Sequence, residues 1–450
     1  MGNVIKTKKG LDIRLVGAAP DKVCATSPVH SFGVVPDHYC GLIPRLAVQV
    51  GDRVLAGDAV IYHKEQPELK LTAPVSGEVV AVKRGAKRKI EYLEIKPDAT
   101  IEYKLFDTKG ILAKDREEIV QLLAESGLVT LFRKRPFDRI VDLTEVPRDI
   151  YVTGYLSAPL MPDVLSLIGD ELAEVQEAMQ LLQKLTAGSV YVGLKKGTHF
   201  DFPQAKVYEI DGPHPAGCAS FLINKTKPLN QGETIWTIGL TELVILGRFL
   251  KTGRVDMRKR IALAGSRMQE RGIAEVVVGS DLAMLTSGKL DTSRGTVRLI
   301  DGDVLSGAMV RGDYRHMSPF TNIITAIPEG DDVHDLLGWA LPGFKKFSVS
   351  RSFPTFLLGR HKEYDIDARL HGGERAIIVS NEYDKVFPLD IFPEQLVKAT
   401  IAFNIDKMEQ LGIYEVAPED FSVCEFVDTS KLELQYIIRQ GLDQLYKELN

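Results

Sequence analysis

Two short stretches of the sequence combine cationic and aromatic side chains, a pairing that suits binding rather than bond breaking. Residues 31–39 read SFGVVPDHY and residues 131–137 read LFRKRPF. Aromatic faces suit a flat, apolar head group, while arginine and histidine donate hydrogen bonds to carbonyl oxygens. The alternative is that each stretch is a packed loop whose arginines reach solvent. The candidate contact residues are Phe32, His38, Tyr39, Arg133, Arg135 and Phe137.

The cysteines and histidines offer only a weak case for a metal. The group nearest in sequence is C-x5-H-x7-H-x-C, a spacing that matches no common zinc pattern, and whether it binds a metal is left open. The sequence has four cysteines and no Cys-x-x-Cys pair, which excludes a disulfide framework and favours a reducing compartment. The residues of this group are Cys24, His30, His38 and Cys40.

Motifs for catalysis are missing. No G-x-G-x-x-G follows an expected strand, no G-x-x-x-x-G-K-[ST] occurs, and no nucleophile stands in an elbow or triad context. Residues 193–200, GLKKGTHF, could cradle a phosphate or form an ordinary loop after a strand. The sequence therefore predicts no catalytic residue.

The first elements that must position these residues are β-strands. Residues 50–82 alternate Gly-Asp turns with apolar runs and resemble the barrel-sandwich fold that carries biotin or lipoate on a lysine. A carrier needs that lysine at the hairpin tip. Here the expected tip is Gln66 and Pro67, with Lys64 and Lys70 on its flanks. We interpret the stretch as a scaffold and docking surface without a swinging arm.

The fold class expected for the whole chain is α+β and α/β multidomain. Strand patterns at residues 149–154, 189–194 and 205–211 alternate with helical patterns, including a strongly amphipathic one at residues 170–188, which indicates an open parallel sheet. We predict a barrel-sandwich-like β domain at residues 1–103, a Rossmann-like α/β domain at 104–255, a small α+β unit at 256–330, and loops and helices at 331–450.

Composition limits the possible partners. The 450 residues are 44% hydrophobic and 26% charged with a net charge of −5, which does not favour nucleic acid. The basic run at residues 83–89, KRGAKRK, is either a solvated hairpin or a patch for an anionic membrane or acidic partner. No run approaches 18 uninterrupted apolar residues. We expect a cytoplasmic protein, free or peripheral.

Four stretches in order resemble one protein family. They are SGLVTLFRKRPF at residues 126–137, GPHPAG at 212–217, TIWTIGLTELVILGRFLKTGRV at 234–255 and VFPLDIFP at 386–393. Together they are similar to the A subunit of the sodium-pumping NADH:quinone oxidoreductase (Na⁺-NQR) of bacteria. That family is related to the FMN-bearing, NADH-binding subunit of complex I and to the C subunit of the Rnf complex. The resemblance implies a β-grasp, SLBB-like unit at residues 256–330.

Two departures from those relatives bear on cofactors. The relatives bind FMN through a glycine-dense loop, whereas the matching stretch here has Gly127 as its only glycine. They also hold iron–sulfur clusters near the carboxyl terminus, whereas Cys424 stands alone and one thiolate cannot hold a cluster. We expect no cofactor on this chain. The alternative is an FMN-binding electron-input subunit of an Rnf- or complex I-like complex.

The resemblance implies a role within a membrane complex. The complex couples NADH oxidation and quinone reduction to Na⁺ export, with flavins and iron–sulfur on other subunits. This chain is expected on the cytoplasmic side of the bacterial inner membrane, beside the integral, quinone-handling B subunit. It is expected to assemble the complex rather than catalyse. Ubiquinone or menaquinone is a possible ligand of the six contact residues named above.

Overall fold

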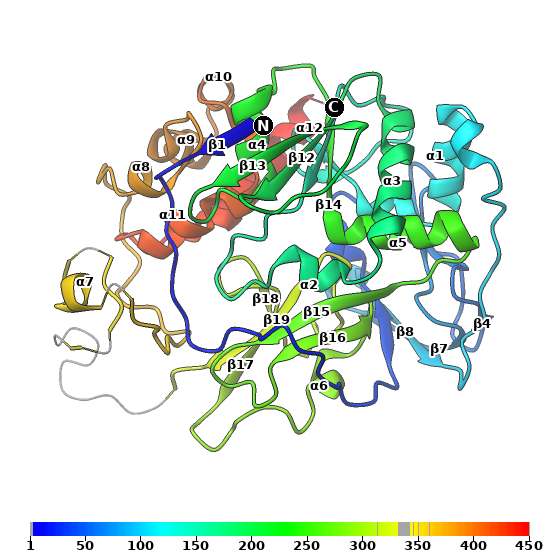
Figure 1. The fold of residues 1–450 in the computed structure, drawn as a ribbon, viewed down its shortest axis with the longest axis horizontal. Helices are drawn as coiled ribbons and strands as arrows, with labels where there is room; N and C mark the ends of the chain where they lie inside the picture. The colour runs from blue at the N-terminus through cyan, green and yellow to red at the C-terminus, as the bar shows by residue number, and fades with distance from the viewer. Residues whose placement is uncertain are drawn as a thin grey trace.

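The computed structural model describes residues 3–312, 314–331, 343–344, 346–349, 351–359 and 361–449 (Figure 1). Its strands form four sheets. The largest has seven strands in the order β1-β13-β12-β11-β14-β9-β10. Their bounds are Asn3–Lys6 (β1), Arg133–Arg135 (β9), Arg139–Ile140 (β10), Ile150–Thr153 (β11), Val190–Lys195 (β12), Ala205–Asp211 (β13) and Ile235–Gly239 (β14).

Helices cover both faces of this sheet. Alternate strand residues point to opposite faces, so Ile150 and Val152 join the core under α1, α3 and α5, whereas Tyr151 packs under α4. In Figure 1 α1, α3 and α5 lie to the right of the sheet. The Rossmann-like domain is thus doubly wound. Its helices are Arg116–Glu125 (α1), Val164–Ile168 (α2), Leu172–Leu185 (α3), Ala219–Thr226 (α4) and Leu240–Thr252 (α5).

The sheet differs from the expected open parallel sheet at both edges. β9 runs antiparallel to β14 and carries β10 as a further antiparallel strand. At the other edge β1 pairs in parallel with β13, although the sequence places residues 1–103 in the β domain. The open edge of a sheet presents unpaired N–H and C=O groups. Asn3–Lys6 pairs with these groups of β13, and the chain then continues to the β domain.

The β domain packs two small sheets face to face. One has the order β2-β8-β7-β4 and the other β3-β5-β6, around a core that includes Val60, Leu71 and Leu93. The basic run at 83–89 forms the exposed turn between β7 and β8. The strands are Phe32–Val34 (β2), Pro44–Leu46 (β3), Arg53–Val54 (β4), Ala59–His63 (β5), Lys70–Thr72 (β6), Gly77–Arg84 (β7) and Ile90–Pro97 (β8).

The tip of the β5–β6 hairpin is docked rather than free. The Gln66 side-chain oxygen accepts a hydrogen bond from the backbone N–H of Leu143 at 3.4 Å. The Thr72 hydroxyl, at the end of β6, donates to the Ser126 carbonyl at 3.1 Å. Both contacts join the sandwich to the α/β domain. A hairpin fixed in this way suits a scaffold, whereas a swinging arm needs a free tip.

The β-grasp unit is a five-stranded sheet in the order β16-β15-β19-β17-β18 with one short helix. β15 and β19 run in parallel at its centre, and the other pairs are antiparallel. Its elements are Arg258–Ala264 (β15), Gly272–Val277 (β16), Leu282–Leu285 (α6), Val297–Asp301 (β17), Ala308–Met309 (β18) and Ile323–Pro328 (β19).

The carboxyl-terminal part is helical around its own apolar core. Residues 393–410 form two helices, α9 and α10, rather than one, because Phe403 has a φ of +47° and the Asn404 side chain caps α10. None of the described helices is long and apolar enough to cross a bilayer. The helices are Thr355–Leu358 (α7), Tyr383–Val386 (α8), Pro393–Ile401 (α9), Ile405–Gln410 (α10), Ser422–Val427 (α11) and Leu434–Leu449 (α12).

Candidate quinone-contact site

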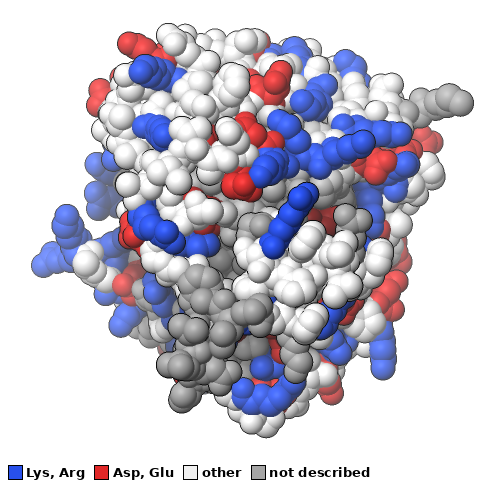
Figure 2. Space-filling model, turned by 90° about the vertical axis from the view of Figure 1, so that its left-hand side faces the viewer, with Lys and Arg blue, Asp and Glu red and all other residues white. Residues whose placement is uncertain are grey.

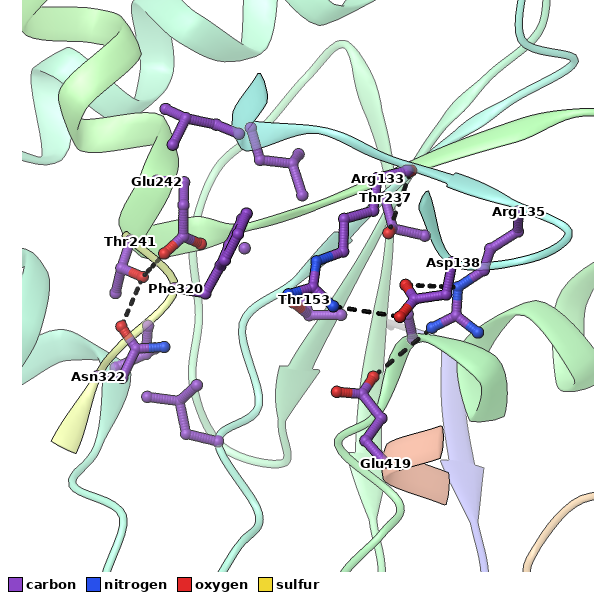
Figure 3. A pocket seen from close by; sticks show the side chains of 16 residues that line it. Arg133, Arg135, Asp138, Thr153, Thr237, Thr241, Glu242, Phe320, Asn322 and Glu419 are labelled. Atoms are coloured by element: carbon purple, nitrogen blue, oxygen red, sulfur yellow. Dashed lines mark hydrogen bonds and ion pairs between the residues drawn. The ribbon is translucent and has the colours of Figure 1, made fainter. Parts of the chain in front are cut away.

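A cavity of about 170 Å³ lies where the α/β domain, the β-grasp unit and the carboxyl-terminal part meet (Figure 3). Thr153 and Gly239, the last residues of β11 and β14, form part of its wall. From β11 the chain order proceeds to β12 and β13 on one side and returns to β14 on the other. Such a switch point in a doubly wound sheet leaves a crevice at the carboxyl ends of the strands, where ligands bind.

Four charged side chains on one side of the cavity form what we call the cavity cluster: Arg133, Arg135, Asp138 and Glu419. Arg133 Nη1 donates to Asp138 Oδ2 at 3.2 Å. The Arg135 guanidinium lies 3.4 Å from Asp138 Oδ1 and 3.6 Å from Glu419 Oε1. Arg135 is 2% exposed, whereas Arg133 is 36% exposed and is the cation available at the surface.

The pKa values of the two acids of the cavity cluster shift in opposite directions. Burial opposes charge on Asp138, but Arg133, Arg135 and Arg439 outweigh it and hold its pKa below the ordinary value. Burial raises the pKa of Glu419, with Arg135 opposing. The two guanidinium groups of the cluster suit hydrogen bonds to a carbonyl or anionic oxygen.

The sequence-predicted stretches meet at Phe320, a residue of the β-grasp unit that lines the cavity. The Arg133 guanidinium lies 4.3 Å from the Phe320 ring centroid. Tyr39 approaches the same ring edge-on at 6.2 Å between centroids. Two aromatic rings and a cation from three domains thus converge. Sequence reasoning missed Phe320, because nothing in its local sequence distinguishes it from an ordinary loop residue.

His38 lies close to this group but in a different environment, which we call the imidazole cluster: His38, His316 and Tyr314. The His38 ring packs edge-on against Tyr314 at 5.3 Å. Nε2 of His38 and both ring nitrogens of His316 have no hydrogen-bond partner among the described residues. Burial lowers the pKa of His38 to about 3 and that of His316 to about 4. Both imidazoles are neutral at pH 7.

The remaining two candidate contact residues lie away from the cavity wall. Phe137 packs edge-on against Tyr414 and Tyr446 in the carboxyl-terminal core. Phe32 is buried in the core of the sandwich. Both rings pack in apolar cores. The mixture of aromatic and cationic residues in the sequence does not separate such core residues from residues that line a binding site.

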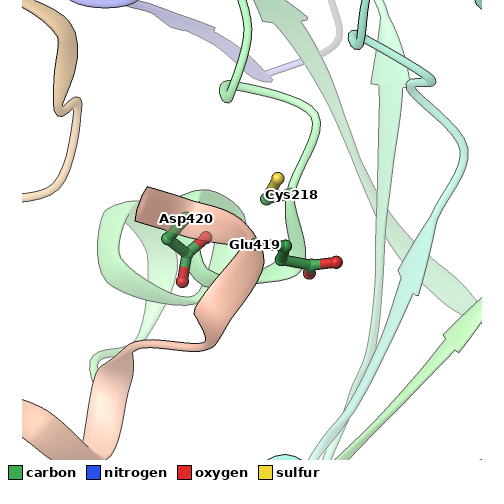
Figure 4. A group of neighbouring side chains, drawn as sticks. All are labelled: Cys218, Glu419 and Asp420. Atoms are coloured by element: carbon green, nitrogen blue, oxygen red, sulfur yellow. The ribbon is translucent and has the colours of Figure 1, made fainter. Parts of the chain in front are cut away.

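The cysteine–histidine group of the sequence does not form a metal site. Cys24 is hydrogen-bonded through its backbone to Ile273 of the β-grasp sheet, whereas Cys40 lies beside Arg139 and Arg439. Within the described residues, the one group of three or more potential ligand atoms within 4.8 Å of one another is Cys218, Glu419 and Asp420 (Figure 4).

The group in Figure 4 does not favour a cation. Burial raises the pKa of the Cys218 thiol well above its ordinary value and that of Asp420 to about 7, so both are poor anionic ligands. The guanidinium of Arg135 already pairs with Glu419, with Nη2 3.6 Å from Oε1. A bound cation would have to compete with that guanidinium.

The candidate phosphate loop at residues 193–200 borders a second, more open cavity of about 560 Å³. Lys195 and Lys196 line it together with Lys8, but so do Asp12 and Asp211. Lys196 Nζ is paired with Asp211 Oδ2 at 2.8 Å. The acids offset most of the positive charge that a phosphate would require.

The stretch expected to replace the flavin loop is packed with side chains. Leu128–Leu131 forms a 3-10 helix whose four residues are buried, and its apolar members join the α/β core. A Cβ at Gly127 would lie 3.0 Å from the Lys70 carbonyl oxygen. Flavin-sized ligands occupy pockets of about 300 Å³ or more. The residues present therefore do not fit FMN at this position.

Family models agree with the fold. NqrA family models match in three places: the N-terminal barrel-sandwich hybrid domain at residues 5–98, the second alpha/beta domain at 114–255 and the C-terminal domain at 260–312. Among solved structures, the NAD⁺-reducing [NiFe]-hydrogenase in the H2-reduced state covers 49% of the chain and 48% of its own at 12% identity, with a TM-score of 0.33.

Full-length relatives carry the name of the A subunit of Na(+)-translocating NADH-quinone reductase. The protein from Rhodopirellula baltica is 34% identical, with 99% of each chain covered. Those from Hahella chejuensis and Vibrio anguillarum are 33% and 31% identical and cover 99% of this chain and 100% of their own. The chain belongs to this family, the NqrA subunits of Na(+)-translocating NADH-quinone reductase, as the ordered motifs predict.

Proposed function

We propose that this chain is the NqrA subunit of a Na⁺-translocating NADH:quinone oxidoreductase complex and that it forms one wall of a quinone site without carrying a redox centre. The observation that carries the proposal is the convergence of Tyr39 and Arg133 on Phe320, beside the cavity at the switch point of the sheet. The complex oxidises NADH, reduces quinone and exports Na⁺, and this chain contributes assembly and ligand contact.

The partners are the other subunits of the complex, above all the integral B subunit that handles quinone. In this proposal the chain sits peripherally on the cytoplasmic side of the membrane, as the family resemblance implies. Flavins and iron–sulfur clusters reside on those other subunits. The sandwich, held to the α/β domain through Gln66 and Thr72, serves as scaffold.

A quinone head group fits the chemistry of the cavity better than a flavin nucleotide. It is flat and mildly apolar, and it has two carbonyl acceptors. Phe320 and Tyr39 offer aromatic faces or edges, and the partly exposed Arg133 offers a donor. Ubiquinone and menaquinone share this head-group chemistry, and both are candidates. The absorbance spectrum of the purified chain tests the flavin alternative. Stoichiometric flavin absorbance would show that the chain is an FMN-binding subunit.

Kinetics of the assembled complex test the quinone contact. We expect Phe320→Leu and Arg133→Gln to raise the KM for quinone roughly five- to tenfold, the effect of losing about 1 kcal/mol of binding, with NADH oxidation unchanged. Phe137→Leu is the matched control, because Phe137 packs in the carboxyl-terminal core. It should lower stability and leave the KM unaltered. Unchanged quinone kinetics in fully assembled Phe320 and Arg133 variants would overturn the proposal.

A further inference from the structure

Exposed apolar side chains are concentrated around α7, away from the cavity. Of the 22 large hydrophobic side chains that are exposed in the described part of the chain, five fall between residues 344 and 358. They include the consecutive residues Phe356, Leu357 and Leu358, the last two 64% and 73% exposed. A run of three exposed apolar residues is unusual on a soluble surface and marks an interaction site.

The residues on either side of α7 are held by packing and hydrogen bonds. The exposed side chains therefore belong to an ordered segment. Phe347 packs against Tyr364 and Phe426, with ring centroids 5.3 and 6.0 Å apart. The buried Thr355 hydroxyl donates to the Lys346 carbonyl at 2.5 Å. The Tyr364 hydroxyl donates to the Gly359 carbonyl at 3.2 Å, just after the helix ends. The inward side chains hold α7 in place while Phe356–Leu358 face outward.

The same segment is strongly basic. Residues 344–362 contain five lysines and arginines and no acid. The Arg351 guanidinium lies 5.8 Å from the Phe356 ring centroid, and Lys362 Nζ donates to the Phe344 carbonyl at 2.9 Å. Figure 2 faces this side of the molecule, where the area beside the grey atoms is mostly white with blue side chains at its border. Among the described residues, Arg351 therefore places a cation beside the apolar tip.

We propose that α7, with the exposed side chains of Phe356, Leu357 and Leu358, inserts into the interface of an anionic lipid bilayer. Leucine and phenylalanine beside lysine and arginine are typical of interfacial segments, and the cations are drawn to anionic head groups. Successive residues of a helix point about 100° apart. Three consecutive apolar side chains therefore cover several directions, which a fluid acyl layer accommodates better than one shaped protein surface. This lipid contact is separate from the proposed contact with the B subunit, and both would hold the chain at the membrane.

Vesicle flotation of the purified full chain tests this proposal. We expect the chain to float with phosphatidylcholine vesicles that contain phosphatidylglycerol, to float less with phosphatidylcholine alone, and to be released by salt. The double variant Leu357→Ser, Leu358→Ser should weaken partitioning about tenfold or more. Arg351→Gln should weaken it less and mainly at low salt.

The matched control is Leu105→Ser, since Leu105 is 69% exposed and precedes the α/β core. It should float like the unmodified chain, and urea unfolding should show equal stability for all variants. Failure of the unmodified chain to float with phosphatidylglycerol vesicles at low salt would overturn the proposal, as would undiminished flotation of the double variant. If the chain does not float but the double variant detaches from membranes that hold the complex, the tip covers a protein and the lipid contact is wrong.

Discussion

The cavity cluster and the imidazole cluster both bury titratable groups between domains. The buried groups of the first cluster are paired with opposite charges, whereas those of the second are uncharged. In the cavity cluster, Arg135 is 2% exposed and has the carboxyl groups of Asp138 and Glu419 beside it. In the imidazole cluster, His38 and His316 have buried ring nitrogens without a hydrogen-bond partner among the described residues, and both rings remain neutral. A strong base must be matched by counter-charge, whereas a weak base can lose its proton instead. The two clusters should therefore respond differently to mutation and to pH.

Removing the buried cation should have the largest effect. Arg135→Met removes the buried cation that lies beside both Asp138 and Glu419, which should cost about 3–5 kcal/mol of unfolding free energy, measured in urea. Arg133→Met is the control, because that side chain is partly exposed and should cost about 1 kcal/mol or less. Equal losses in the two variants would show that burial does not distinguish these arginines.

Acidification should destabilise the chain through the imidazole cluster. The folded pKa values of about 3 and 4 lie below the unfolded value near 6.5, so the unfolded state binds more protons. Stability is full above pH 6.5 and falls as the pH drops toward 4, with a slope of up to about 1.4 kcal/mol per pH unit for each ring. His38→Phe should remove its share of the slope in urea unfolding between these pH values. A slope that His38→Phe leaves intact would contradict the assignment.

Asp420 should act in the opposite direction. Burial raises its folded pKa to about 7, above the unfolded value, so its contribution is full below pH 4 and is lost as the pH rises through 7. Asp420→Asn retains an oxygen for the Ala417 N–H, which lies 2.7 Å from Oδ2. The variant should gain about 1–2 kcal/mol at pH 8 and nothing at pH 4, because Arg135 offsets part of the burial. Destabilisation at pH 8 would mean that the carboxylate is needed charged.

The smallest effect is expected at an exposed pair next to the imidazole cluster. Lys89 Nζ lies 2.5 Å from Asp37 Oδ2, and both side chains are more than half exposed. Lys89→Gln should therefore change the unfolding free energy by about 0.5 kcal/mol or less, and by nothing at high salt. Lys83→Gln on the same hairpin is the reference for removing a charge alone. A loss above about 1 kcal/mol for Lys89→Gln would place this pair with the buried charges.

Local sequence predicted the elements better than their meeting points. The strand at residues 205–211 and the helix expected at 170–188, observed as Leu172–Leu185, follow from periodicity. The antiparallel β9 was missed, because RKR has no apolar alternation and gains its strand partner only from β14. The pairing of Asn3–Lys6 with β13 was also missed, since no local signal indicates a partner so distant in the sequence.

The site shows the same limit. Arg133 and Tyr39 were identified by side-chain chemistry, and the structure brings both to Phe320. Phe137 has the same chemistry but turns toward Tyr414 and Tyr446. Phe137 lies beyond the end of β9, in a turn where its φ is +79°. The direction of a side chain at such a position depends on tertiary packing, so type and spacing alone could not separate a candidate contact residue from a core residue.

The edge position of β1 also has a consequence for how the chain is made. Asn3–Lys6 leaves the ribosome long before its partner, Ala205–Asp211, has been synthesised. Further along, Leu15 must wait for Tyr364, and Val23 for Ile273. These are contacts of high sequence separation, which close late because the intervening loop must first be ordered. During translation the sandwich is expected to form while Asn3–Lys6 is still unpaired, so this segment is placed only after β13 has been made.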